Sequence, residues 1–400
     1  MEGLNILFLT YAYPPQKFPR SIQISHLVQY LRKDFNITVV TSEPQDAEDS
    51  SLLNFTPLDN VIYAPKSNFT KAVELSKGNS IKKNIFPDPQ YLWHFDLLKK
   101  SQNLIENSLP DIIVTFGHPM STHIAGLKLK QKYPNITWLA HFSDPWVDNI
   151  FNDYNIWTRL INKYYQDSVF KNADRLIFTS TETIDLVTEF YSSSVREKSV
   201  YLPHVFNEDL YTQKENIANE RIIFRYIGNF YGNRQPDSLL KALQLLSTEQ
   251  RAQFRIEFFG SSTESLQVMI SEYKLEDTVF AYSSVSYIKS LELMHSADML
   301  LIIDAPTEKS PFLPSKLIDY IGSDKPIFGI TPPGTSQKLI EEMGFLVADS
   351  RDISDIANKL KKIIEICYKD KVKKIPSSIR SRYSISTVGE LIKEILENGE

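Results

Sequence analysis

The chain has 400 residues, of which 42% are hydrophobic, 23% charged and 12% aromatic, and these values are typical of globular domains with sizeable cores. This length exceeds one ordinary core and favours two domains. The formal net charge of −5 argues against a nucleic-acid-binding protein, which usually carries a basic surplus. The single cysteine, Cys367, excludes an internal disulfide and a thiolate metal cluster, and it suits a reducing compartment.

The N-terminus enters an apolar segment at once, without the basic stretch and apolar region of a secretion signal. No apolar run approaches the roughly 20 residues of a transmembrane helix. We therefore expect a cytoplasmic protein whose contact with the inner face of a membrane, where it has one, is peripheral.

The first elements in the chain form a βαβ unit. A strand over 5–10 is followed by a proline-rich loop over 11–20, a helix over 21–33 and a strand over 37–41, and this order predicts a parallel sheet. Residues 42–108 show weak periodicity and predict a loop-rich insertion with a helix from about Tyr91. Loops of this kind on a rigid sheet are where binding specificity would be set.

Strands continue to alternate with helices through the rest of the chain. The further strands of the first domain are predicted at 111–116, 136–140, 175–180 and 200–202, with a helix over 121–132. A hinge is predicted at 203–207, where a proline and polar residues follow a strand. The strands of the second domain are predicted at 222–227, 255–259, 278–282, 299–303, 326–330 and 345–348. This alternation predicts a second doubly wound sheet, and a final amphipathic helix is expected over 388–396.

A short helix is predicted within the stretch from Pro311 to Gly322, shortly after an apolar strand. Pro314 suits the first helical position, and Gly322 suits the C′ position that ends a helix. Open α/β sheets bind ligands at the carboxyl ends of their strands, where this helix would begin.

The first turn of that helix has the composition of an anion site. The free N–H groups of Ser315 and Lys316, the helix dipole and the Lys316 ammonium would together bind phosphate. Asp319, three residues later on the same face, would accept hydrogen bonds from hydroxyls, and this pairing suits a nucleotide sugar. A capped surface helix with an ion pair between Lys316 and Asp319 is the alternative interpretation.

A second candidate for binding a diphosphate is the turn after the first strand of the second domain. Gly228, Asn229 and Gly232 would let backbone N–H groups approach the ligand, and Arg234 lies six positions after the first glycine. An arginine there can hold a phosphate with two parallel N–H bonds. The alternative is that Arg234 is an exposed cation at the start of a helix.

Three stretches resemble the GT-B glycosyltransferases of family 4, the group 1 type. Pro-Ser-Lys-Leu-Ile-Asp-Tyr followed by Gly-Ser-Asp-Lys-Pro-Ile, within 311–327, is similar to the donor-site signature of that family. The segment His-Phe-Ser-Asp-Pro-Trp over 141–146 is similar to a strand-end segment of the family, and the glycine turn over 226–234 matches its phosphate loop. The rest of the chain matches more loosely.

The resemblance implies an α/β protein with the GT-B fold, in which two Rossmann-like doubly wound domains face a cleft. We expect an acceptor-side domain over 1–203, a nucleotide-sugar-binding domain over 204–384, and a C-terminal helix over 385–400 that crosses back to the first domain. GT-A enzymes hold a metal with Asp-x-Asp, which this chain lacks. No metal or other cofactor is therefore expected, and Arg234, Lys316 and helix amides would neutralise the leaving diphosphate.

On the acceptor side, the resemblance points to Lys17 and Arg20 in the first loop and to Asp144 after the fourth predicted strand. Lys17 and Arg20 would supply positive contacts or would be solvated loop cations. Asp144 would orient the acceptor or the sugar, or would only cap the turn before Pro145. His118 and His141 are weaker candidates, because a lone histidine is more often a structural residue.

The chain also departs from the family in three places. It has no glycine between Gly3 and Gly78, where relatives have glycines in the first loop. Pro311 stands where the first of two donor-site acids is common, so that only the displaced Glu308 is near. Ser143 stands where a histidine is common, and alternation along the strand would point Ser143 and Asp144 to opposite sides.

The function implied is a retaining transfer of a sugar from a nucleoside diphosphate donor to a hydroxyl of a glycan or lipid-linked glycan, in the synthesis of a bacterial surface glycan. The catalytic candidates are Asp144, Arg234 and Lys316. Two alternatives remain: a nucleotide-sugar 2-epimerase of the same fold, and a partner subunit of this fold without catalysis. The residue patterns alone lead only to two Rossmann-like domains with an anion site on the second.

Overall fold

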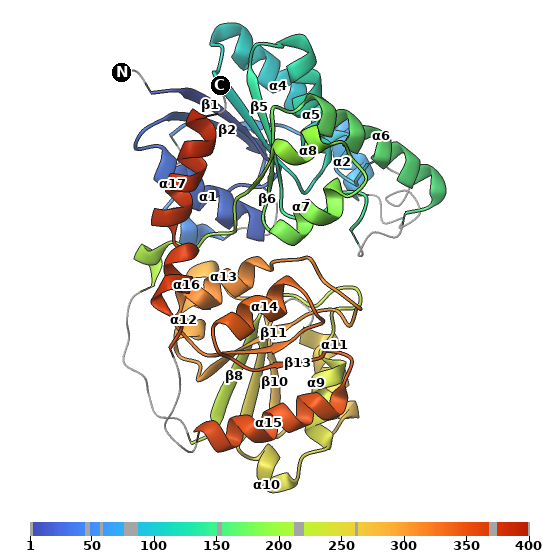
Figure 1. The fold of residues 1–400 in the computed structure, drawn as a ribbon, viewed down its shortest axis with the longest axis vertical. Coiled ribbons are helices and arrows are strands. Elements are labelled where there is room, and N and C mark those ends of the chain that lie inside the picture. Colours follow the sequence, from blue (N-terminus) through green and yellow to red (C-terminus); the bar gives the residue numbers. More distant parts are fainter. Residues whose placement is uncertain are drawn as a thin grey trace. The chain divides into compact units, whose positions relative to one another are not determined.

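The computed structural model describes residues 3–44, 49–56, 59–75, 87–149, 154–211, 220–260, 263–367 and 374–398. The chain divides into two compact units. The first contains residues 1–203 and 385–400, and the second contains residues 204–384. Figure 1 shows that each unit has its own sheet with helices packed around it.

The sheet of the first unit has seven parallel strands in the order β3-β2-β1-β4-β5-β6-β7. The strands are β1 (Asn5–Leu9), β2 (Asn36–Ser42), β3 (Val61–Ala64), β4 (Ile112–Phe116), β5 (Thr137–Phe142), β6 (Arg175–Phe178) and β7 (Ser199–Tyr201). The helices are α1 (Pro19–Leu31), α2 (Asn68–Leu75), α4 (Trp93–Asn107), α5 (Ser121–Lys132), α6 (Ile156–Asn172), α7 (Thr181–Thr188), α8 (Ser193–Glu197) and α17 (Ile385–Glu397), with a 3-10 turn at η1 (Ser50–Leu52).

The second unit has a six-stranded parallel sheet in the order β10-β9-β8-β11-β12-β13. The strands are β8 (Ile222–Ile227), β9 (Phe254–Phe259), β10 (Val279–Tyr282), β11 (Met299–Ile303), β12 (Ile327–Ile330) and β13 (Val347–Ala348). The helices are α9 (Asp237–Gln244), α10 (Thr248–Arg251), α11 (Thr263–Glu272), α12 (Tyr287–His295), α13 (Ser315–Gly322), α14 (Thr335–Glu342), α15 (Ile353–Cys367) and α16 (Ser377–Arg382), with a 3-10 turn at η2 (Glu208–Leu210).

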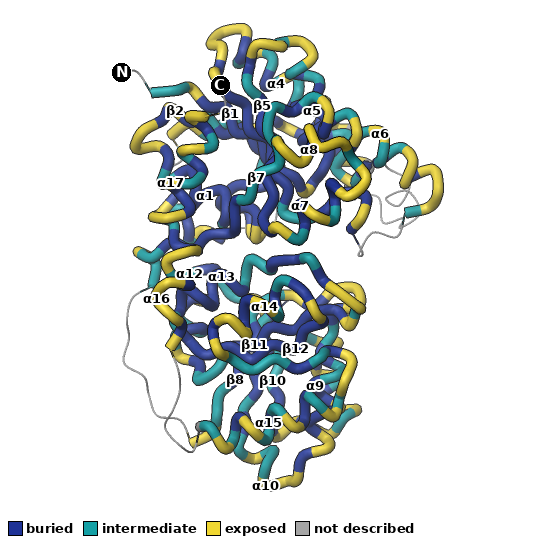
Figure 2. The backbone as a smooth tube through the Cα atoms, in the orientation of Figure 1, coloured by how far each residue is buried: buried dark blue, intermediate teal, exposed yellow. Residues whose placement is uncertain are grey.

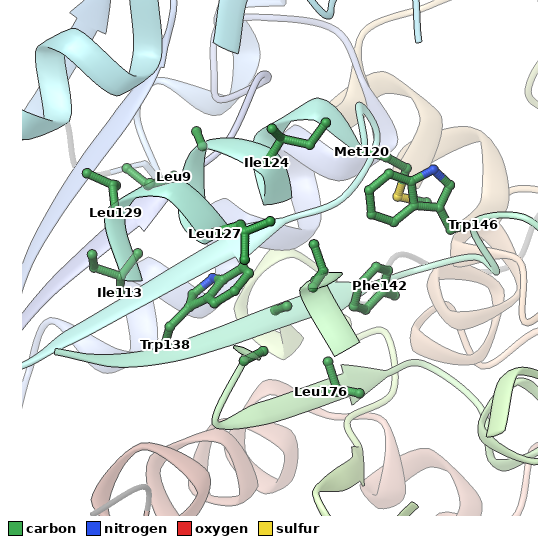
Figure 3. Close-up of a cluster of buried hydrophobic side chains, with 14 of the residues drawn as sticks. Leu9, Ile113, Met120, Ile124, Leu127, Leu129, Trp138, Phe142, Trp146 and Leu176 are labelled. Atoms are coloured by element: carbon green, nitrogen blue, oxygen red, sulfur yellow. The ribbon is translucent and has the colours of Figure 1, made fainter. Parts of the chain in front are cut away.

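The predicted pair of doubly wound parallel sheets is confirmed. β4 (Ile112–Phe116) and β11 (Met299–Ile303) are almost wholly apolar because helices cover both faces of each sheet, and β11 lies in a buried part of the tube in Figure 2. In the first unit, side chains from β5 and α5 meet in the core, where Leu127 lies beside Trp138 and Phe142 lies farther along β5 in Figure 3.

The strand order reverses once in each sheet. β1 pairs with both β2 and β4, and β8 pairs with both β9 and β11. Loops from the two central strands therefore diverge to opposite sides, and the space at the carboxyl ends between them is where open α/β sheets bind ligands. The loop after β8, the residues after β11 and the helix α13 all lie at this point of the second unit.

The predicted limits of the helix in 311–322 are wrong in two places. Pro314 has extended backbone and is the N-cap of α13, so the helix begins at Ser315. Gly322 is the last helical residue and not the C′ residue. A Cβ at Gly322 would lie 2.6 Å from the Tyr211 ring and 2.8 Å from the Phe206 ring, so close packing, and not a left-handed turn, requires glycine there.

The segment 42–108 is more regular than predicted. It contributes the edge strand β3 and the helix α2, which the weak periodicity did not indicate, in addition to the predicted helix, observed as α4. Val61–Ala64 is too short, and too exposed at its first three residues, to give a clear pattern. Other parts of this insertion, residues 45–48, 57–58 and 76–86, lie outside the described residues, and Gly78 is among them.

The C-terminal helix α17 lies beside α1, although the two helices are far apart in the sequence (Figure 1). Tyr30 donates a hydrogen bond to Glu390 at 2.5 Å, and Lys393 pairs with Asp34 at 2.9 Å. Gly389 allows the close approach, because a Cβ there would clash with the Tyr30 ring. The last helix thus completes the first unit.

We predict that Gly389→Ala destabilises the first unit, although alanine usually favours a helix interior by about 1 kcal/mol over glycine. The added methyl must displace the Tyr30 ring, and overpacking of this kind costs about 1–3 kcal/mol. All four tryptophans lie in the first unit, so urea unfolding followed by tryptophan fluorescence reports on it. Glu394→Ala, at an exposed position of the same helix, should change the free energy of unfolding by less than about 0.5 kcal/mol. Equal stability of both variants would contradict the packing role of Gly389.

Candidate functional site

In the second unit, two cations and one carboxylate meet at the point where the strand order reverses. Arg234 comes from the loop after β8, Asp304 follows β11 directly, and Lys316 is in the first turn of α13. Arg234 Nη2 lies 3.1 Å from Asp304 Oδ1, and both side chains are buried. The second oxygen of Asp304 is buried without a hydrogen-bond partner among the described residues. The cluster has one positive charge more than it has negative charges.

Lys316 is held against the glycine turn. Its ammonium lies 3.8 Å from the centroid of the Tyr226 ring, and a Cβ on Gly228 would lie only 2.6 Å from Nζ. Gly228 has φ +140°, a conformation that glycine adopts readily. Burial, together with the neighbouring Arg234 charge, lowers the pKa of Lys316 well below its usual value, and Asp304 opposes this shift. A bound anion would stabilise the ammonium further.

Tyr320 explains why α13 presents Lys316 at this place. The Tyr320 hydroxyl accepts a hydrogen bond of 3.0 Å from the backbone N–H of Ile227, the last residue of β8. Its side chain is fully buried, so the bond ties α13 to the carboxyl end of the strand that leads into the glycine turn. The N-terminal turn of α13, with Ser315 and Lys316, is thereby fixed next to Gly228.

Asp319 is buried, and one of its two carboxylate oxygens already has partners. Its Oδ1 accepts hydrogen bonds from the hydroxyl of Tyr287 at 2.8 Å and from the hydroxyl of Tyr211 at 3.2 Å. Burial raises the pKa of Asp319 to about 7, although both tyrosine hydrogen bonds act in the opposite direction. The alternative interpretation as a surface helix is wrong, because the residues from Leu317 to Gly322 are all buried.

The two other expected members of the donor site are less enclosed. Asn229 is exposed after the glycine, and its carbonyl oxygen accepts a hydrogen bond of 3.3 Å from the Tyr226 hydroxyl. Ser315 is partly buried at the start of α13. The alternative interpretation of Arg234 as an exposed cation is wrong, since its side chain is only 8% exposed and also donates to the Tyr231 hydroxyl at 2.8 Å.

In the first unit, the carboxyl ends of the central strands bring His118 and Asp144 together. His118 Nε2 lies 3.1 Å from Asp144 Oδ2, and about half of the His118 side chain is exposed. His118 has φ +52°, a left-handed conformation that is uncommon for a residue with a Cβ. Ser143 donates a hydrogen bond of 3.1 Å to the same carboxylate oxygen. The expectation that Ser143 and Asp144 point to opposite sides is therefore wrong, because β5 ends at Phe142 and the strand alternation ends with it.

Arg20 is not a solvated loop cation. It is buried, and its guanidinium donates to the carbonyl oxygens of Gly117 at 3.0 Å and His141 at 3.3 Å. Burial lowers the pKa of Arg20 to about 10, and the Asp144 charge opposes that shift. Arg20 thus connects the ends of β4 and β5 and places a positive charge near Asp144.

The remaining two acceptor-side candidates are Lys17 and His141, and the side chain of neither forms part of the His118–Asp144 pair. Lys17 is exposed in the loop before α1. His141 is buried, with its ring 5.2 Å from that of Phe116, and it enters the cluster through its backbone carbonyl. Of the four candidates, the structure brings together Arg20 and His118 with Asp144.

Sequence reasoning did not identify Asp304, Tyr211, Tyr287 or Asp88. Asp88 accepts hydrogen bonds from the backbone N–H and the hydroxyl of Ser121 at 2.7 and 3.0 Å, and burial raises its pKa to about 6. It therefore caps α5 from 33 residues away. A signal was present only for Asp304, since a charged residue directly after a buried strand lies at the ligand-binding edge.

A known family matches the second unit of the chain. The model of the family "Glycosyl transferases group 1" matches residues 207–375. No match was found among curated proteins. The second unit, with its glycine turn and α13, is thus the part that the family model describes.

Solved structures resemble both units. Sucrose-phosphate synthase from Thermosynechococcus elongatus is similar with a TM-score of 0.74 at 15% identity, over 98% of both chains. HepE from Anabaena, in complex with UDP and glucose, has a TM-score of 0.71 at 14% identity, over 99% of this chain and all of the other. WaaG, a glycosyltransferase involved in lipopolysaccharide biosynthesis, has a TM-score of 0.64 at 15% identity, over 98% of this chain and all of the other. Residues 207–375 therefore match the glycosyl transferases group 1 family, and the chain as a whole has the GT-B fold of these similar structures.

Proposed function

We propose that the chain transfers a sugar from a nucleoside diphosphate-sugar to a hydroxyl group with retention of the anomeric configuration and without a metal. The observation that carries the proposal is the convergence of Arg234 and Lys316 on the glycine turn at the reversal of strand order. Two cations and the first N–H groups of α13 suit a leaving diphosphate, whose negative charge grows as the glycosidic bond breaks. Because the similar HepE was solved in complex with UDP, uridine is the first base to test.

Asp304 has a defined part in this arrangement. Its carboxylate neutralises Arg234 before the donor binds, and it keeps the guanidinium from turning away from the loop. Asp319 would accept hydrogen bonds from the ribose hydroxyls with Oδ2, because Oδ1 already accepts hydrogen bonds from two tyrosine hydroxyls. Gly228 would let the diphosphate approach the backbone as closely as Lys316 does now.

On the first unit, we assign Asp144, oriented by His118, to the acceptor or to the transferred sugar. In a retaining transfer on one face of the sugar, an oxygen of the leaving phosphate can take the proton of the acceptor. The protein then chiefly orients the two substrates and stabilises charge. The acceptor would be a glycan or lipid-linked glycan of a bacterial surface, made on the cytoplasmic side, and the similarity to WaaG, which is involved in lipopolysaccharide biosynthesis, supports this choice.

We predict that Lys316→Ala lowers kcat/KM for the donor about 30- to 1,000-fold, which corresponds to about 2–4 kcal/mol of lost transition-state stabilisation. Lys241→Ala, which removes an exposed cation from α9, is the matched control and should leave kcat/KM unchanged. Arg234→Ala should show a similar loss, together with a lower melting temperature, because Asp304 is then buried without its partner. Release of the nucleoside diphosphate from a panel of nucleotide sugars measures the rates. Turnover of Lys316→Ala within about threefold of the wild type would exclude the diphosphate site.

We predict that the affinity for a nucleoside diphosphate rises with pH through about 7, because the ionised Asp319 accepts hydroxyl hydrogen bonds better than the protonated acid. Asp319→Asn should weaken binding about tenfold at high pH and remove this part of the pH dependence. Calorimetry at several pH values tests both points, and the variant controls for protonation of the ligand itself. The same pH dependence in both proteins would exclude Asp319 from the site.

The pH dependence of stability gives an independent check of the raised pKa of Asp319. The pKa in the folded state, about 7, lies above the ordinary value of 3.8, so the folded protein binds the proton more tightly than the unfolded chain does. The contribution of Asp319 to stability therefore falls as pH rises from about 4 to about 7. The melting temperature of Asp319→Asn should therefore fall less over that pH range than the melting temperature of the wild type.

We predict that Asp144→Asn reduces turnover moderately and leaves the product anomer unchanged, because asparagine keeps the shape and part of the hydrogen bonding. Asp144→Ala should lose substantially more, since His118 then has no carboxylate to pair with. NMR of the product gives the anomeric configuration, and kcat is measured beside it. Complete loss of turnover in Asp144→Asn with normal binding of both substrates would show that a catalytic base is required. Wild-type turnover with a lower melting temperature would show a purely structural role.

A product analysis separates the proposal from its alternatives. Formation of a glycoside that depends on an acceptor supports transfer, whereas conversion of the donor without any acceptor would indicate an epimerase. Donor that stays intact in the presence of a full acceptor extract would indicate a partner subunit without catalysis.

A further inference from the structure

Over its first three turns, the helix α6 of the first unit buries polar side chains and exposes apolar ones. Its side chains that face the protein are polar: Thr158, Asn162 and Gln166 are all buried, four residues apart along the helix. Helices on a protein surface usually bury an apolar stripe instead. α6 lies at the margin of the first unit (Figure 1), and much of it is coloured as exposed in Figure 2.

Hydrogen bonds hold the polar face in place. Asn162 Oδ1 accepts from the indole N–H of Trp146 at 2.6 Å, and Gln166 Oε1 accepts from the backbone N–H of Val147 at 3.0 Å. Gln166 also donates to the Tyr191 hydroxyl at 3.0 Å. Rotating α6 to bury its apolar side would break these bonds and bury unpaired amides, so the orientation is specified.

The outward face of α6 is apolar as a consequence. Ile156 is 65% exposed, Trp157 71%, Leu160 54% and Tyr164 68%. Positions 156, 160 and 164 follow each other at four-residue spacing, and position 157 lies beside them on the helix surface. Removing each such side chain from water stabilises by about 1.5–3 kcal/mol, so leaving four of them exposed on one helix marks an interaction surface.

The charges around this apolar stripe are mainly positive. Arg159, Lys163 and Lys171 are the basic residues of α6, and Asp167 is its one acidic residue. Asp167 pairs with Lys163 at 2.7 Å, and Asp148, in the segment before the helix, lies 3.9 Å from Arg159. Three basic residues thus stand beside two acidic ones, and one positive charge remains. A second copy of this chain, bound through the same face about a two-fold axis, would bring like charges together.

We propose that α6 binds the surface of an anionic membrane, with Ile156, Trp157, Leu160 and Tyr164 inserted at the level of the lipid headgroups. Tryptophan and tyrosine favour this zone because their rings are apolar at one end and polar at the other. Lys171 contacts the lipid phosphates, and Arg159 does so in exchange for its long, exposed pair with Asp148. No helix among the described residues combines the length and apolar character needed to cross a bilayer, so the contact is interfacial.

The bonds of α6 connect this surface to the candidate acceptor site. Trp146 and Val147 lie two and three residues after Asp144 in the chain, and both are bonded to the buried face of α6. A membrane on the outer face of the helix is therefore near the edge of the sheet that carries Asp144. This consequence rests on the proposed function, whereas membrane binding by α6 does not.

The test uses the full chain and sedimentation with lipid vesicles, without any donor or acceptor. Binding should be stronger to phosphatidylcholine vesicles that contain phosphatidylglycerol than to pure phosphatidylcholine, and salt should weaken it. Trp157→Ser with Leu160→Ser should lower the affinity at least about tenfold, since two inserted side chains are lost. Arg159→Gln with Lys171→Gln should remove most of the preference for the anionic lipid.

Leu109→Ser is the matched control, because Leu109 is 60% exposed in the same unit and precedes β4, at the opposite end of the sheet from Asp144. It should bind vesicles as the wild type does. Melting temperatures should be unchanged in all these variants, since every altered side chain is exposed. This outcome and the transfer assay are independent, so vesicle binding by a protein without transferase activity would leave the inference standing.

Three results would overturn the inference. The first is no binding to either kind of vesicle. The second is binding that Trp157→Ser with Leu160→Ser leaves unchanged. The third is a concentration-dependent dimer that this double variant abolishes in the absence of vesicle binding, which would identify a second copy of the chain as the occupant of the face.

Discussion

Two positive charges held in a partly buried place are the constraint on which the second unit depends. Arg234 can stay buried because Asp304 pairs with it, and Lys316 can stay nearby because Tyr226 offers its ring face. One carboxylate does not compensate two cations, so the site retains a charge that an anion can neutralise. The parallel sheet makes this arrangement accessible, since all three charged residues leave from the carboxyl ends of strands or from the helix that follows.

The same logic places the first unit's candidate site at its own reversal of strand order. There Arg20 uses its donors on two strand-end carbonyls and so serves the architecture as well as the charge of the site. Asp144 pairs with His118 and accepts a hydrogen bond from Ser143, and both of these residues are at least partly exposed to solvent. The second unit thus gathers cations at its reversal of strand order, while the first gathers a carboxylate and an imidazole at the corresponding place.

α6 illustrates how a sequence can be misinterpreted when the usual rule for helices is inverted. Its apolar residues have helical spacing, and by themselves they would indicate a core-facing stripe. The structure shows the opposite orientation, because Asn162 and Gln166 bond the segment after Asp144. Polar side chains that satisfy distant backbone and indole groups decided which face is buried.

The sequence by itself determined the two doubly wound sheets, because alternation of apolar runs with helical periods leaves few other topologies. The strands 222–227 and 299–303 and the helix 121–132 were predicted at the limits observed, since their apolar and helical patterns are long and unambiguous. It also placed Gly228, Arg234 and Lys316 at the carboxyl edge of the second sheet, because their positions relative to the strands follow from order along the chain.

Only the tertiary structure decided which of these side chains meet. The pairs Arg234–Asp304, His118–Asp144 and Asp319–Tyr287 each join residues from different elements, and no local pattern encodes them. The burial that raises the pKa of Asp319 arises in the same way, from tyrosines that reach it from α12 and from the segment after η2. Spacing along a chain specifies the face of a helix or strand, whereas contact and desolvation depend on what packs against that face.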